Sequence, residues 1–129
     1  MTKMNLLLDT HTFLWAISNS PKLSAATRAA IVDGGNIIYV SAVTAWEIAI
    51  KRARGKLEMP PIDYYQQLQL HRFTPLSITT AHALAVESLP AHHSDPFDRM
   101  LIAQAREESL TLVTHDRRLS LYDVRIIHT

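Results

Sequence analysis

The chain is organised around the stretch HSDPFDRMLIAQA, residues 93–105. This stretch predicts a helix, because Asp95 can cap its first turn and Pro96 suits the first helical position. Asp98 falls three residues after the cap, where a carboxylate faces backbone N–H groups that have no helical partner. At helical spacing, however, Asp98 shares a face with Ile102. A carboxylate on an apolar face is costly unless a positive charge meets it, so we expect a cation near Asp98.

The composition favours one compact domain spanning residues 1–129, because 129 residues with 47% apolar side chains suffice for a single hydrophobic core. A net charge of +1 means that nucleic-acid binding would depend on local patches. The absence of cysteine excludes disulfides and thiolate metal sites. Residues 1–8 are too short for a signal peptide or a membrane span, so we expect a soluble, cytoplasmic protein with no membrane partner.

Apolar runs alternate with amphipathic segments along the chain. The expected strands are residues 5–8, 37–40, 73–76, 110–113 and 124–127. The expected helices are residues 11–17, 24–31 with Ser24 as the cap, 42–54, 63–71, a segment from Thr79 or Thr80 to before Pro90, and the helix that contains Asp98. This alternation predicts an α/β fold, with a central parallel sheet of about four to five strands and helices on both faces.

Four acids fall where such a sheet brings segments together. Asp9 and Asp116 each follow an apolar strand, at the edge where open parallel sheets place their ligand sites. Glu47 is the only acid between positions 41 and 57, and Asp98 lies in the first turn of its helix. Four converging carboxylates repel one another unless a hard divalent cation binds them. Oxygen ligands of this kind suit Mg²⁺ or Mn²⁺.

Four motifs in this order resemble those of PIN-domain nucleases of the VapC toxin type, over about residues 4–127. The motifs are Leu6-Leu7-Leu8-Asp9, Trp46-Glu47-Ile48, residues 95–105 (DPFDRMLIAQA) and Leu112-Val113-Thr114-His115-Asp116. The resemblance implies a PIN-like three-layer sandwich with the first strand central. It assigns Asp9, Glu47, Asp98 and Asp116 to the family's catalytic metal site, and Thr114 to the hydroxyl position beside the last acid.

The same resemblance implies a function. It predicts a divalent-metal-dependent, single-strand-specific endoribonuclease that hydrolyses RNA to 5′-phosphate and 3′-hydroxyl ends. It also implies the toxin of a type II toxin–antitoxin pair, a homodimer, and inhibition by a cognate antitoxin protein. Arg99 and Arg117 lie next to proposed ligands and are candidates for phosphate contacts. Counting back from Ala103 and Ala105 places Asp98 at the catalytic position and leaves Asp95 as the cap, although both carboxylates belong to the motif.

Each of these acids also has a purely structural interpretation. Asp9 could cap the following helix, Glu47 could pair with Lys51 one turn on, and Asp116 could open a short helical turn. The alternative function is a non-catalytic α/β binding module whose acid cluster docks a basic partner peptide. The aspartate-nucleophile phosphatase pattern fails, because it needs an aspartate two residues after Asp9, where the chain has His11.

Overall fold

The computed structural model describes residues 3–56 and 62–129. The strands are β1 (Asn5–Leu8), β2 (Ile37–Ser41), β3 (Thr74–Leu76), β4 (Thr111–Thr114) and β5 (Ile126–His128). The helices are α1 (Thr10–Ile17), α2 (Ala25–Val32), α3 (Ala42–Ala53), α4 (Tyr64–Leu70), α5 (Thr80–Ala85) and α6 (Pro96–Glu107), with 3₁₀ turns η1 (Val86–Ser88) and η2 (Arg117–Leu121). The expected strands and helices are confirmed, with most boundaries moved by one or two residues.

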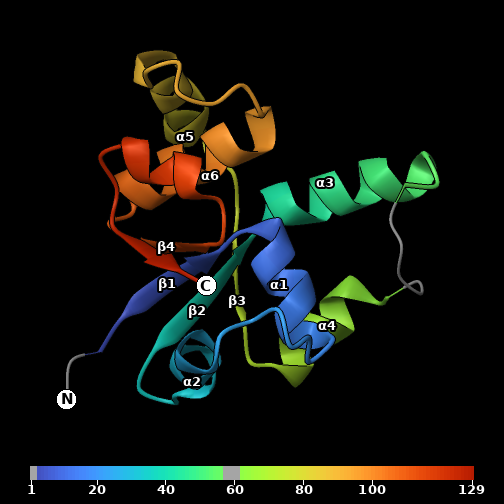
Figure 1. The fold of residues 1–129 in the computed structure, drawn as a ribbon. Helices are drawn as coiled ribbons and strands as arrows, with labels where there is room; N and C mark the ends of the chain where they lie inside the picture. Colours follow the sequence, from blue (N-terminus) through green and yellow to red (C-terminus); the bar gives the residue numbers. More distant parts are fainter. Residues whose placement is uncertain (1–2, 57–61) are drawn as a thin grey trace.

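The five strands form one parallel sheet in the order β3-β2-β1-β4-β5. The first strand is therefore central, as the resemblance implied. Helices α1, α2 and α4 lie on one side of the sheet, and α5 and α6 lie on the other (Figure 1). This is the three-layer α/β sandwich expected from the sequence, and all five strands point their carboxyl ends to the same edge.

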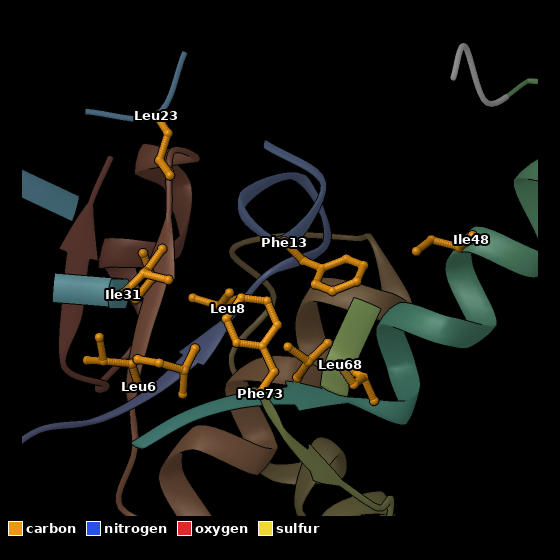
Figure 2. Packing of buried hydrophobic residues seen from close by; sticks show 11 residues of the cluster. Leu6, Leu8, Phe13, Leu23, Ile31, Ile48, Leu68 and Phe73 are labelled. Atoms are coloured by element: carbon orange, nitrogen blue, oxygen red, sulfur yellow. The ribbon is translucent and has the colours of Figure 1, made fainter. Parts of the chain in front are cut away.

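The centre of the fold is β1, whose three leucines have no exposed surface. Because side chains alternate along a strand, Leu6 and Leu8 face one layer and Leu7 faces the other. Leu6 and Leu8 pack with Phe13 of α1 and Leu68 of α4, as Figure 2 shows. Leu7 belongs to a second cluster, to which α6 contributes more buried residues than any other element. Full burial of each leucine contributes about 1.5–3 kcal/mol, so burial on both faces fixes β1 and the residue that follows it.

The helix that contains Asp98 is positioned at both its start and its middle. Asp95 caps α6 by accepting hydrogen bonds from the backbone N–H groups of Phe97 (2.8 Å) and Asp98 (3.2 Å). Farther along, the fully buried side chain of Gln104 accepts a 2.6 Å bond from the hydroxyl of Ser41, at the end of β2. These contacts place the first turn of α6 at the carboxyl edge of the sheet.

Within residues 3–56 and 62–129, no helix combines the length and the apolar character needed to cross a bilayer.

Candidate active site

A pocket of about 240 Å³ lies at the carboxyl edge of the sheet, and all four predicted acids line it. The acidic residues around the pocket are Asp9, Glu47, Asp95, Asp98 and Asp116. The other residues around it are Thr10, His11, Lys51, His93, His115 and Arg118. The structure therefore brings together carboxylates that the sequence separates by up to about a hundred residues. We refer to this feature as the acidic pocket.

Asp9 follows β1 and is buried, with 5% of its surface exposed. One of its oxygens accepts a 2.9 Å bond from the backbone N–H of Thr12 and so caps α1. The other oxygen accepts a 2.6 Å bond from the hydroxyl of Thr114, which is fully buried. The capping role and the place in the acidic pocket therefore coexist, and Thr114 lies beside Asp9 and fixes the orientation of its carboxylate.

Glu47 reaches the acidic pocket from the middle of α3, and it too is buried. Its Oε1 accepts a 2.7 Å bond from the hydroxyl of Thr10, the residue after Asp9. Its Oε2 accepts a 2.6 Å bond from Nζ of Lys51 one helical turn on, so the pair considered from the sequence does form. Because the carboxylate of Glu47 is buried and lines the pocket, this ion pair is not a solvent-exposed surface pair. It holds the carboxylate in one orientation.

Asp98 experiences the combined charge of the cluster. Burial raises its pKa first, and the neighbouring carboxylates of Asp95, Asp9, Glu47 and Asp116 raise it further, to about 7. A carboxyl group with this pKa binds a proton under conditions where an ordinary aspartate does not. The acidic pocket thus has an excess of negative charge that a proton or a metal cation can neutralise.

Asp116 lies on the exposed side of the cluster and caps the 3₁₀ turn η2. The guanidinium of Arg118 donates to both of its oxygens, at 3.1 and 2.9 Å. These hydrogen bonds lower the pKa of Asp116 to about 2. Asp98 and Asp116 are thus neighbouring carboxyl groups whose pKa values are shifted in opposite directions. Burial and nearby carboxylates raise the pKa of Asp98, whereas the guanidinium of Arg118 lowers the pKa of Asp116.

His93 joins Asp98 and Asp116, and sequence reasoning assigned it no role. Its Nε2 lies 3.1 Å from Oδ2 of Asp98 and 3.2 Å from Oδ2 of Asp116. Its Nδ1 accepts the backbone N–H of Asp95 at 3.2 Å, which leaves the ring proton on Nε2 as a donor to both carboxylates. Its position two residues before the Asp95 cap is the one sequence signal that could have pointed to it.

Arg99 is not among the residues that line the acidic pocket, and the phosphate contact expected of it stays a prediction. Its guanidinium donates to backbone carbonyls of the segment before α6 and to one hydroxyl. The acceptors are the carbonyl oxygens of Val86, Leu89, Pro90 and His93, and the hydroxyl of Tyr122. Arg99 therefore holds the segment that contains His93 against α6.

The phosphate contact expected of Arg117 also stays a prediction, since this residue is exposed and is not among the residues that line the acidic pocket. Its neighbour Arg118 does line the pocket, and 64% of its side chain remains exposed. The guanidinium of Arg118 is therefore the one of the two that can reach an anion beside Asp116.

The atoms around the acidic pocket that could bind a metal are mostly carboxylate oxygens, which fit a hard divalent cation such as Mg²⁺ or Mn²⁺. One oxygen each of Asp98 and Asp116 lies within 4.8 Å of the other and of Nε2 of His93, whose ring proton is donated to these carboxylates. Asp9 and Glu47 complete the cluster from β1 and α3. The raised pKa of Asp98 is consistent with this fit, because a group that favours neutralisation by a proton also favours a metal cation.

Comparison with known proteins agrees with this fold over most of the chain. The PIN domain model matches residues 6–125. Ribonuclease VapC22 of Mycobacterium tuberculosis is 35% identical over 117 residues, which cover 88% of each chain.

Solved structures agree in fold. VapBC2 from Rickettsia felis, bound to a DNA fragment from its promoter, matches with a TM-score of 0.69 at 15% identity, over 97% of this chain and 98% of that one. DNA-bound VapBC from Salmonella typhimurium matches with a TM-score of 0.67 at 21% identity, over the same shares of the two chains. Since the family model spans nearly the entire sequence and the parallel sheet carries its acids at the expected edge, the chain belongs to the PIN-domain family.

Proposed function

We propose that residues 1–129 form one nuclease domain that hydrolyses phosphodiester bonds of single-stranded RNA in a divalent-metal-dependent reaction. The observation that carries the proposal is the convergence of Asp9, Glu47, Asp98 and Asp116, from four separate segments, on one pocket. The raised pKa of Asp98 supports it, because this acid cluster favours a bound cation. The similarity to Ribonuclease VapC22 supports RNA as the substrate.

Asp9, Asp98 and Asp116 would hold Mg²⁺ or Mn²⁺, with Glu47 as a ligand directly or through water. When bound, the metal would supply Lewis acidity that lowers the pKa of a coordinated water and polarises the scissile phosphate. Thr114 and Thr10 orient the carboxylates of Asp9 and Glu47 by hydrogen bonds of 2.6 and 2.7 Å. Arg118 is placed to donate to a phosphate oxygen at the edge of the pocket, because its guanidinium is largely exposed.

No covalent protein intermediate is required for this chemistry. The chain contains no cysteine, and the hydroxyls of Thr10 and Thr114 are each donated to a carboxylate. Products with 5′-phosphate and 3′-hydroxyl ends, which the family resemblance implies, form when water attacks the phosphorus and the bond to the 3′ oxygen breaks, so that this oxygen leaves with a proton.

We further propose that the protein is the toxin of a type II toxin–antitoxin pair and acts in the cytoplasm as a homodimer. The name of the VapC relative and the VapBC complexes among the structures of similar fold support a cognate antitoxin as partner. An arginine or lysine of such a partner could enter the acidic pocket and neutralise it. Metal-dependent turnover, rather than peptide binding, therefore separates a nuclease from a non-catalytic docking module.

The test is cleavage of total RNA by the purified protein with Mg²⁺, with Mn²⁺ and with EDTA. We expect discrete products with either metal, and none with EDTA or with Asp98→Asn. His71→Ala serves as the matched control, because His71 lies at the end of α4 and stacks on Phe73, away from the pocket. Cleavage that persists in EDTA or in Asp98→Asn would overturn the proposal. Lack of both cleavage and Mn²⁺ binding would favour the docking module.

A further inference from the structure

Three rings gather at one side of the acidic pocket, and nothing in the proposed chemistry uses them. The imidazole of His11 lies nearly parallel to the indole of Trp15, at 12° with ring centroids 5.8 Å apart. The imidazole of His115 contacts both, with centroids 5.5 Å from His11 and 4.8 Å from Trp15. We call His11, Trp15 and His115 the ring platform.

The topology explains why the ring platform forms beside the acids. His11 and Trp15 are four residues apart on α1, so they share one face of that helix. His115 directly precedes Asp116, and β1 and β4 are neighbouring parallel strands that end together. His11 and His115 both line the acidic pocket, because each lies within two residues of one of its acids. Both residues are exposed. Trp15 is half-buried and packs against the hydrophobic core on the α1 side of the sheet.

We propose that the ring platform stacks an unpaired nucleobase of the RNA, next to the phosphodiester that the acidic pocket cleaves. Bases stack on the faces of histidine and tryptophan, and this interaction needs no particular base sequence. A base inside a duplex already has both faces covered, so only an unpaired nucleotide can use the platform. The inference rests on the proposed function and identifies the residues that select single-stranded substrate.

The charge distribution around the ring platform agrees with a nucleic-acid ligand. Nζ of Lys22, an exposed residue, lies 6.0 Å from the centroid of the Trp15 ring. Arg118, also exposed, lies at the acidic pocket itself. A strand whose base rests on His11 and His115 therefore meets a cation near the platform and another near the acids, which offsets the repulsion between phosphates and carboxylates.

The experiment measures binding apart from cleavage. In an Asp98→Asn, Trp46→Phe protein, Trp15 is the remaining tryptophan, so its fluorescence reports on the platform. We expect quenching on titration with a short unpaired oligoribonucleotide, and little with the same strand annealed to its complement. Replacing His11 and His115 together by alanine should weaken binding of the unpaired strand about tenfold or more. His71→Ala, which removes a stacked imidazole far from the pocket, should leave it unchanged.

Three results would overturn the inference. Equal affinity of the double alanine variant and its parent would exclude stacking on these rings, and equal binding of duplex would exclude selection for an unpaired base. If the double alanine change in the otherwise wild-type protein weakened Mn²⁺ binding as much as RNA binding, the rings would serve the ion site instead. Since binding is measured in a variant that does not cleave, a failure of the nuclease assay with wild-type protein is a separate result and contradicts the proposed function alone.

Discussion

Asp98 is the residue at which burial and four neighbouring carboxylates act together, and its pKa of about 7 has a consequence for stability. The folded state holds this proton up to about neutral pH, whereas the unfolded chain releases it near the ordinary value of about 4. Between these values the folded state binds more protons than the unfolded state, so the free energy of unfolding falls as pH rises. Asp98 therefore lowers the free energy of unfolding of the metal-free protein most above neutral pH.

We predict that Asp98→Asn stabilises the metal-free protein at about pH 8, by at most about 4 kcal/mol, and has little effect near pH 4. The amide removes the charge that becomes costly above neutral pH and keeps nearly the same shape. Thermal unfolding in EDTA at several pH values measures this effect. Asp95→Asn is the matched control, because it keeps an N-cap group and should give a smaller gain of the same sign. An Asp98→Asn protein that is less stable than wild type at high pH would contradict the pKa assignment.

A second prediction at the residue scale concerns His93. Its Nε2–H lies between Asp98 and Asp116 and holds the two carboxylates in one orientation. Groups that orient metal ligands typically affect metal affinity 10–100-fold when they are removed, so His93→Ala should weaken Mn²⁺ binding about tenfold or more, measured by calorimetry. His93→Gln keeps a donor and should lose less. If His93→Ala bound Mn²⁺ as tightly as the neighbouring control His92→Ala, the orienting role would be excluded.

At the scale of elements, α6 depends on Arg99 for the position of the segment before it. One guanidinium satisfies four backbone carbonyls between residues 86 and 93, a geometry that the single ammonium of lysine cannot reproduce. We expect Arg99→Ala to lower the free energy of unfolding by about 1–3 kcal/mol, because it leaves carbonyl groups without their donor. Arg99→Lys should rescue little of this loss in denaturant unfolding. Arg106→Ala, an exposed change on the same helix, is the control, and equal stability of the Arg99 and Arg106 variants would contradict this role.

The start of α6 could be predicted from sequence because the signals that set it are local. Asp95 and Pro96 act within one helical turn, and the structure places the cap and the first helical residue where the sequence predicts them. The role of Arg99 could not be predicted in the same way, because adjacent residues on a helix point in different directions. Proximity to Asp98 in sequence thus suggested a site residue, whereas the side chain turns toward residues 86–93.

His93 and Arg118 were missed for a related reason. Their partners depend on the path of loops and of the 3₁₀ turn η2, which no periodic pattern encodes. His93 contacts Asp116 across 23 positions of sequence, and Arg118 rather than Arg117 meets Asp116 because of the local turn. Asp9, Asp98 and Asp116 were easier to predict, because ends of parallel strands and first turns of helices meet at one edge of such a sheet. Glu47, in the middle of α3, stood out instead as the only acid between positions 41 and 57.

At the scale of the whole molecule, the parallel sheet makes a single site out of distant segments. The central place of β1 puts Asp9 between β2, which leads to the helix with Glu47, and β4, which leads to Asp116. The fold therefore holds like charges close together before any ligand is added, and their repulsion lowers the free energy of unfolding. Mn²⁺ should raise the unfolding temperature of the wild-type protein, because a ligand that binds only the folded state stabilises it.

The measurement that tests the acid cluster most directly is a calorimetric titration of the metal-free protein with Mn²⁺, beside Asp98→Asn and the His71→Ala control. We predict saturable binding to wild type and to His71→Ala, with affinity weakened at least about tenfold by Asp98→Asn. Equal Mn²⁺ affinity in all three proteins, or no binding to any of them, would contradict the assignment of Asp9, Glu47, Asp98 and Asp116 as one divalent-metal site.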